Sequence, residues 1–177
     1  MLTGLLAGLV GLAIDAWEIF PSVMAVSATN PVARSFPDTF LYFWMYFTHL
    51  TNLGLIVVYA AELSGGRQMG WARTAAARAI GAGYIALVGV FYHVMLAPTL
   101  HMEGALAVAT WLLHYVTPIV FLLWWIGSPH GELRFRQVPG LLLPGLAYVG
   151  LVLLRGAVSG EYPYDILDAG KFGYLHV

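Results

Sequence analysis

Polar side chains lie in the middle of two long apolar stretches of this chain, where they could carry out chemistry away from water. The second stretch, 105–126, contains His114 near its centre. The first stretch, 39–63, contains four such residues, Thr48, His49, Thr51 and Asn52. Each stretch has about the 20 mostly apolar residues that a membrane-spanning helix needs, and polar groups at membrane depth usually mark a functional site. The pattern predicts a polar site between two helices inside a membrane.

These residue types favour a hydroxyl nucleophile that is activated by a histidine. Thr48, Thr51 and Asn52 share one helical face by their spacing of three and four residues, whereas His49 points about 100° away. His114 could take the proton of Thr48 as a general base, with Thr51 as a rival nucleophile. Asn52 or Thr51 would then hold the developing oxyanion. Removal from water favours the neutral imidazole that a base requires.

Two other interpretations remain open from the residues alone. The first is a purely structural role. A threonine hydroxyl in a membrane helix often bonds to a carbonyl four residues earlier or to a neighbouring helix, and a histidine can be an interhelical donor. The second is a metal site, because three histidines and two acidic residues would supply enough ligands. These residues are Asp15, Glu18, His49, His93 and His114. No pair has the HExxH spacing, so the favoured interpretation includes neither a metal nor a cofactor.

Further polar and aromatic residues are candidates for binding a substrate or supporting the site. These residues are Thr51, Asn52, His49, His93, Trp111, Arg155, Tyr162, Tyr164 and Asp165. Arg155 is expected near the outer end of its helix, where it could pair with Asp15 or Glu18. Two roles remain open for Arg155, which could form a structural ion pair or anchor a substrate carboxylate.

Composition places the chain in a membrane. Of its 177 residues, 60% are hydrophobic and only 10% are charged, and the mean hydropathy is +0.78. Soluble domains carry about 25% charged residues. The net charge of −1 argues against a nucleic-acid partner, and the absence of cysteine excludes disulfides, thiolate metal sites and cysteine nucleophiles. The expected partners are membrane lipid and a lipid-like substrate.

The apolar segments predict an all-α, polytopic membrane helix bundle with five transmembrane helices in a single domain, 1–177. The spans are expected at about 1–20, 39–63, 76–97, 105–126 and 138–154, followed by an outer tail over 155–177. The segment 1–20 has no positively charged start, so we interpret it as a retained helix and not as a signal peptide.

Basic residues in the short connections predict the orientation of this bundle. Arg67 and Arg73 lie between the second and third spans, and Arg134 and Arg136 lie between the fourth and fifth. Because Arg-bearing connections face the cytoplasm, the N-terminus is expected there too.

That orientation predicts that the two candidate catalytic residues lie at the same depth. Thr48 is nine residues past Thr39, and His114 is nine residues past Ala105. In straight helices that enter from the outer face, each would lie about 14 Å deep. The inner halves of the spans are largely apolar, so we expect a cavity that is open to the outer side.

Four short sequences together resemble bacterial members of the androgen-induced membrane protein family. They are FTHLTN in the second span, LLHYVTP in the fourth, RG at the end of the fifth, and the EYPYDILDAGKFGY that follows. The similarity runs along nearly the whole chain. Eukaryotic members of the family are the androgen-induced protein and the androgen-dependent regulator of tissue factor pathway inhibitor.

The resemblance implies an intramembrane hydrolase that cleaves fatty-acid esters of hydroxy fatty acids with a threonine nucleophile and a histidine base. The histidine corresponds to His114, and the threonine to Thr48 by the most direct match, with Thr51 as the alternative. Three residues, and not the four of the eukaryotic pattern, separate His114 from Pro118. The family also carries a span after the YPYD segment, so this chain is either a five-span variant or lacks a sixth helix.

The leading prediction is therefore a threonine-type lipid ester hydrolase. The alternative is a non-enzymatic membrane protein that binds a lipid or small molecule in the same polar pocket, or a histidine-rich metal-dependent membrane enzyme. A transporter receives little support, because the five expected spans show no internal repeat.

Overall fold

In the computed structural model, residues 1–27, 30–130 and 133–177 are described, and every regular element within these ranges is helical. The longer helices are α1 (Leu2–Met24), α2 (Phe36–Trp44), α3 (Phe47–Ser64), α4 (Ala75–Phe91), α5 (Gly104–Trp111), α6 (Thr117–Ile126) and α7 (Val138–Ser159). Two π turns, η2 (Tyr92–Leu96) and η3 (Leu112–Val116), extend α4 and join α5 to α6. The predicted all-α fold is confirmed.

The lengths and composition of these helices agree with an integral membrane protein. Four helical stretches are long and apolar enough to cross a membrane, Leu2–Met24, Ala75–Leu96, Gly104–Ile126 and Phe135–Ser159. Helices α2 and α3 pass the same test as a pair that is bent by 78°. Counting that pair as one span gives the five spans expected from the sequence.

The expected span over 39–63 is not one straight helix. The chain breaks at Met45 and Tyr46, between the end of α2 and the start of α3. At a bend of 78°, α2 contributes little length along the axis of α3. The depth of Thr48 therefore does not follow from its distance along the sequence from Thr39.

Helix boundaries follow local capping signals. Ser35 caps α2 by accepting a hydrogen bond from the Asp38 N–H at 3.4 Å, with Pro37 in the first turn. Thr74 caps α4 in the same way through the Ala77 N–H at 3.1 Å. Gly65 ends α3 at a φ of 63°, in the left-handed region that glycine adopts without steric cost.

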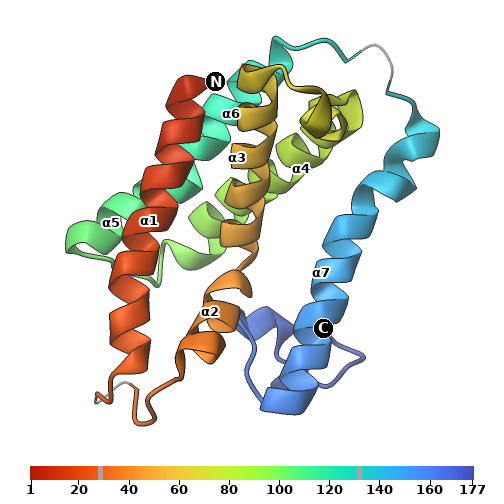
Figure 1. The fold of residues 1–177 in the computed structure, drawn as a ribbon. Coiled ribbons are helices and arrows are strands. Elements are labelled where there is room, and N and C mark those ends of the chain that lie inside the picture. The colour runs from red at the N-terminus through yellow and green to blue at the C-terminus, as the bar shows by residue number, and fades with distance from the viewer. Residues whose placement is uncertain (28–29, 131–132) are drawn as a thin grey trace. The chain divides into compact units, whose positions relative to one another are not determined.

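The described residues form two compact units, Met1–Leu133 and Arg134–Val177. In the first unit, α1 packs against α3 and against the stretch from α5 to α6, whereas α4 packs against α3 and α6 (Figure 1). The N-terminus, the connection from α3 to α4 and the end of α6 lie at the same end of this unit, at the top of Figure 1.

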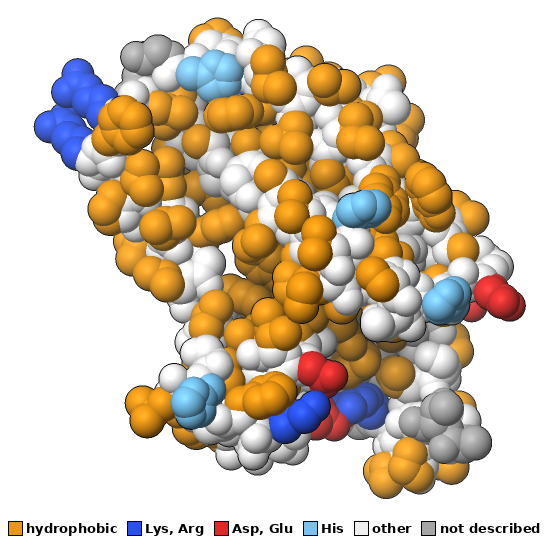
Figure 2. All heavy atoms as spheres, turned by 180° about the vertical axis from the view of Figure 1, so that it is seen from behind, with side chains coloured by type: hydrophobic (Ala, Val, Ile, Leu, Met, Phe, Trp, Pro, Cys, Tyr) orange, Lys and Arg blue, Asp and Glu red, His pale blue; other side chains and the backbone are white. Residues whose placement is uncertain are grey.

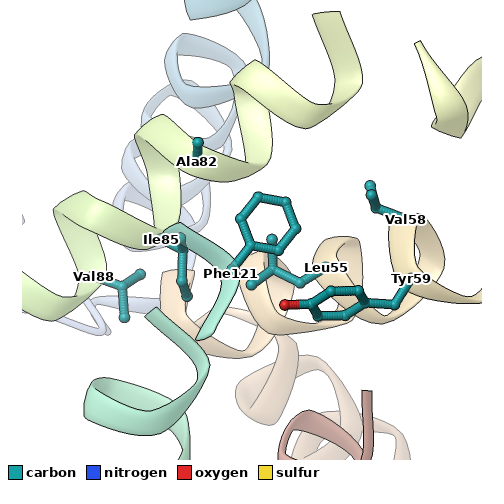
Figure 3. Close-up of a cluster of buried hydrophobic side chains, with 7 residues drawn as sticks. All are labelled: Leu55, Val58, Tyr59, Ala82, Ile85, Val88 and Phe121. Carbon is teal, nitrogen blue, oxygen red and sulfur yellow. The ribbon is translucent and has the colours of Figure 1, made fainter. Parts of the chain in front are cut away.

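Apolar side chains from three helices form the main core of the first unit (Figure 3). They are Leu55, Val58 and Tyr59 of α3, Ala82, Ile85 and Val88 of α4, and Phe121 of α6. The rings of Tyr59 and Phe121 meet edge to face at 5.4 Å. This core holds α3 beside the stretch from α5 to α6, the two segments that carry the candidate catalytic residues.

Glycines on α1 allow this helix to approach its neighbours closely. A Cβ atom on Gly11 would lie 2.7 Å from a methyl carbon of Leu113, and one on Gly4 would overlap the Tyr59 ring. Small residues at helix contacts are typical of membrane bundles, because they let the backbones come together. Asp15, one turn beyond Gly11, is thereby carried against α3.

The second unit contains η4 (Phe135–Gln137), α7, η5 (Asp165–Leu167) and α8 (Ala169–Phe172). Helix α7 runs to Ser159 and does not end near Leu154 as expected, so Arg155 is a helical residue. The Tyr162 ring lies directly on Gly156, where a Cβ atom would have no room.

The surface is largely apolar, as a lipid-facing protein requires. Figure 2 shows that hydrophobic side chains cover most of the face that it draws, with few charged side chains among them. Leu6, Leu87, Val90 and Leu123, on three different helices, are each about half exposed or more. Such extensive exposure would be unfavourable in water, so it supports the membrane environment inferred from composition.

Candidate active site

The bend between α2 and α3 places Thr48 in the first turn of α3. Tyr46 is the N-cap residue and Phe47 the first residue of the helix, so Thr48 follows directly after the bend. Its side chain is buried at 8% exposure. The backbone N–H of Thr48 has no carbonyl acceptor within α3, because the N–H groups of a first turn precede the hydrogen-bond ladder.

A π turn places His114 opposite Thr48. In η3 the Thr117 N–H bonds to the Leu112 carbonyl, five residues earlier. The next bond of this type would need an N–H on Pro118, which has none, so the Leu113 carbonyl is left for other donors. Turns of this kind are frequent at functional sites.

Thr48 and His114 form a hydrogen-bonded pair with a defined tautomer. The Thr48 Oγ1 atom lies 3.2 Å from His114 Nε2, and His114 Nδ1 lies 3.0 Å from the Thr110 carbonyl oxygen. Because a carbonyl only accepts, Nδ1 carries the hydrogen of the neutral ring and the Nε2 lone pair faces the Thr48 hydroxyl. This is the arrangement in which a histidine can remove a hydroxyl proton.

Asn52 and Thr117 form hydrogen bonds that connect the backbone of Thr48 to the π turn before Thr117. Asn52 Nδ2 donates to the Thr48 carbonyl at 2.9 Å and to the Leu113 carbonyl at 3.3 Å. The Thr117 hydroxyl lies 2.7 Å from Asn52 Oδ1 and 3.0 Å from the Leu113 carbonyl oxygen. Both Asn52 amide hydrogens therefore have backbone acceptors, so Asn52 holds α3 to the π turn. Its expected role as the oxyanion donor is not favoured by this geometry.

His49, the residue after Thr48, contacts two other helices. Its Nε2 atom is 2.9 Å from Asp15 Oδ2 of α1, and its Nδ1 atom is 2.6 Å from the Phe43 carbonyl oxygen of α2. The Phe43 and His49 rings stack with centroids 4.0 Å apart. His49 thus links the three segments that meet at the bend.

Thr51 and two further candidates of the first unit lie outside this hydrogen-bonded pair. Thr51 is buried on α3, and the threonine whose hydroxyl meets His114 is Thr48. His93 is exposed, and its Nδ1 atom lies 3.2 Å from the Tyr115 hydroxyl. Trp111 is 63% exposed one turn before His114.

The remaining candidates belong to the second unit. The expected pairing of Arg155 with Asp15 or Glu18 of the first unit stays a prediction. Within its own unit, Arg155 forms an ion pair with Glu161 at 3.0 Å. The reason is local, because the chain turns back after α7 and brings Glu161 to a residue six positions earlier. Tyr162, Tyr164 and Asp165 follow in the same segment, with Asp165 beginning η5.

The metal interpretation has no support from the arrangement of the histidines. Among the described residues, no three His, Asp or Glu side chains lie close enough together to hold a metal ion. The ring nitrogens of His49 are bonded to Asp15 and Phe43, and those of His114 to Thr48 and Thr110.

Three contributors to the site were not identified from the sequence. They are Thr117, the carbonyl of Thr110, and Tyr92, whose ring lies 4.1 Å from the His114 ring. A Thr-Pro pair three residues after a histidine in a membrane span was a usable signal for Thr117. The other two depend on the π turn and on the packing of α4, which no local pattern shows.

No protein-family model, curated protein or solved structure matches this chain. The resemblance to the androgen-induced membrane protein family therefore stays a prediction that depends on the four sequence motifs.

Proposed function

We propose that this chain is an integral membrane hydrolase of lipid esters, with Thr48 as the nucleophile and His114 as the general base. One observation carries the proposal, the 3.2 Å contact between Thr48 Oγ1 and a His114 Nε2 atom whose tautomer is fixed by Thr110. The motifs shared with the androgen-induced membrane protein family point to the same two residues.

The proposed reaction proceeds through an acyl-enzyme. Thr48 Oγ1 attacks the ester carbonyl carbon while its proton passes to His114 Nε2, and the carbonyl electrons move onto oxygen. Collapse of this intermediate breaks the bond to the alkoxy leaving group, which takes the proton from His114. Water then attacks the acyl-threonine and loses a proton to His114. When the bond to Thr48 Oγ1 breaks, this oxygen takes the proton from His114, and the carboxylic acid leaves.

The Thr48 backbone N–H is the best-placed donor for the oxyanion. It belongs to the first turn of α3, where N–H groups have no helical acceptor and the helix dipole favours negative charge. It also belongs to the nucleophilic residue itself, so it is next to the carbon under attack. A backbone donor of this kind is fixed before the reaction begins.

The surroundings of the pair favour a lipid substrate. Trp111 is exposed one turn before His114, and the Tyr92 ring packs on the imidazole. Val90 and Val94, at the end of α4 and in η2, are more than half exposed. An ester with long acyl chains could approach such a site from the bilayer. The family resemblance specifies fatty-acid esters of hydroxy fatty acids as the substrates to test first.

The proposed location is the cytoplasmic membrane of a bacterium with the N-terminus inside. Arg73 and Arg78 lie at the end of the first unit that also holds the N-terminus (Figure 1). Both lie close to Glu62, with Arg78 Nη1 at 2.9 Å from a carboxylate oxygen. By the positive-inside rule, this end faces the cytoplasm and the bend before Thr48 faces outward.

The test is labelling of the detergent-purified protein with a fluorophosphonate probe, followed by peptide mapping. We expect one adduct, on Thr48, that disappears in Thr48→Val and in His114→Ala. Thr99→Val is the matched control, because Thr99 is exposed in the connection after η2, and it should leave the labelling unchanged.

Two results would contradict the proposal. An adduct on Thr51 would assign the nucleophile to the other threonine. No adduct in protein that unfolds cooperatively on heating would argue against nucleophilic catalysis and favour a protein that binds lipid without turnover.

A further inference from the structure

The break between α2 and α3 needs a physical cause. Sharp helix breaks occur at proline, at glycine, at π turns, or where a side chain inserts into the hydrogen-bond ladder. Between Phe36 and Ser64, the proline is Pro37 in the first turn of α2 and the glycine is Gly54 in the middle of α3. Neither lies at the break, so an inserted side chain remains.

His49 is that side chain. In a continuous helix the Phe43 carbonyl would accept the N–H of Phe47, four residues later. Instead it accepts from His49 Nδ1 at 2.6 Å. The imidazole therefore takes the place of a backbone donor and satisfies the end of α2, which leaves the chain free to turn into α3.

Asp15 holds the His49 ring in the orientation that this bond requires. Its carboxylate lies 2.9 Å from His49 Nε2, and both side chains are almost fully buried. Because the Phe43 carbonyl only accepts, Nδ1 carries a hydrogen, and a second proton lies between Nε2 and the carboxylate. The Phe43 ring also stacks on the imidazole. The ring is thus fixed by α1 and α2 together.

We propose that His49, oriented by Asp15, is a positioning residue that fixes the bend between α2 and α3 and thereby sets the Thr48 hydroxyl against His114. The inference depends on the proposed function, since it assigns His49 a part in the same reaction. His49 touches neither the substrate nor the reacting atoms. It acts through its neighbour Thr48, because the residue at which α3 begins determines where the Thr48 side chain points.

The geometry predicts which substitutions are tolerated. Asp15→Asn can still hold the ring, because its amide donates to a neutral His49 Nε2 while Nδ1–H donates to Phe43. His49→Asn keeps a donor near the position of Nδ1. His49→Leu and Asp15→Leu remove these bonds and should release the bend.

The bend can be measured without an activity assay. Because the chain contains no cysteine, introduced cysteines can be labelled specifically. Spin labels on Leu41→Cys in α2 and Leu63→Cys in α3, both exposed positions, report the distance across it. A straight helix would separate these 22 steps by about 33 Å, and the bent pair is several Å shorter. We expect His49→Leu to lengthen or broaden this distance and Asp15→Asn to leave it unchanged. An unchanged distance in His49→Leu would overturn the proposal.

Labelling kinetics test the consequence for Thr48. In His49→Leu, the labelling rate at saturating fluorophosphonate should fall by about 100-fold, with little change in the half-saturating concentration, because misplacing a reacting group by an ångström has that effect. Asp15→Asn should label like the unaltered protein. Phe121→Leu controls for stability, since it weakens the core without touching the bend, and it should keep the labelling rate. Equal loss in Phe121→Leu and His49→Leu would contradict a positioning role.

The two measurements separate this inference from the proposed function. A bend that relaxes in His49→Leu, in a protein that never labels Thr48, would uphold the structural half of the inference and reject the hydrolase. A labelled Thr48 whose rate is unaffected by His49→Leu would support the hydrolase and reject His49 as its positioning residue.

Discussion

Asn52 and Thr117 show how polar atoms are kept within an apolar bundle. Asn52 is fully buried, and both its oxygen and its nitrogen have partners, at the Thr117 hydroxyl and at two backbone carbonyls. A buried polar group is costly mainly when its partner is missing. Asn52 and Thr117 therefore join α3 to the π turn and hold Thr48 opposite His114.

Replacing Thr117 by valine tests this arrangement at the scale of one hydroxyl. Thr117→Val keeps the shape but leaves the buried Asn52 oxygen without its donor, so the free energy of unfolding should fall by about 1–3 kcal/mol. Denaturant unfolding in detergent measures the change. Thr99→Val removes an exposed hydroxyl and should shift stability by less than about 0.5 kcal/mol. Equal effects of the two substitutions would show that the buried bond contributes nothing.

Three irregular elements build the site from otherwise ordinary helices. The first is the bend at Met45 and Tyr46, after which Thr48 lies in the first turn of α3. The second is the π turn η3, which carries His114 opposite Thr48. The third is the glycine face of α1, which brings Asp15 into contact with His49. The bend and the π turn give up regular backbone bonds, and side chains bond to the carbonyls left over: His49 to that of Phe43, and Asn52 to that of Leu113.

A methyl group on α1 probes the third of these elements. In Gly11→Ala the new Cβ would lie 2.7 Å from a methyl carbon of the buried Leu113, next to His114, so either α1 or the Leu113 side chain must shift. We expect a loss of about 1–3 kcal/mol in the free energy of unfolding. Gly54→Ala is the matched control, because nothing lies within 4 Å of its Cβ position, and it should be neutral or stabilising by up to about 1 kcal/mol. Thermal unfolding of both variants in detergent would show the difference, and a stable Gly11→Ala would contradict the close packing of α1.

For the whole molecule, helix directions and basic residues together predict one orientation. Successive helices of the first unit alternate in direction, and the connections that hold Gly70 and His101 lie at opposite ends of the stretch formed by α4 and η2. If this stretch crosses the membrane, the positive-inside rule predicts that Gly70 faces the cytoplasm and His101 the outer side.

Single cysteines test this orientation, because the natural chain has none. In intact cells, a membrane-impermeant maleimide should label His101→Cys, whereas Gly70→Cys should react only after the membrane is opened. Both positions are exposed, and no atom lies within 4 Å of the Cβ position of Gly70. The reverse pattern would invert the orientation and place the bend before Thr48 on the cytoplasmic side.

The amino-acid sequence by itself determined the class of fold. A chain with 60% hydrophobic residues, arranged in stretches of about 20, has few alternatives to membrane-spanning helices, since each helix satisfies its own backbone bonds. Capping residues such as Thr74 and Gly65 also mark helix ends locally. The sequence further pointed to His114 and to Thr48, with Thr51 as the alternative threonine, because polar groups in apolar stretches are rare and costly.

Only the tertiary structure decided how these residues meet. The bend depends on a bond between His49 and Phe43 and on Asp15, which is 34 residues away in the sequence. Local periodicity predicted a straight helix there, and it could not show that His49 would replace a backbone donor. The same holds for the ion pair of Arg155 with Glu161, which the sequence pattern did not predict. Apolar periodicity records which face of a helix is buried, whereas the partner of each polar group is set by packing between distant segments.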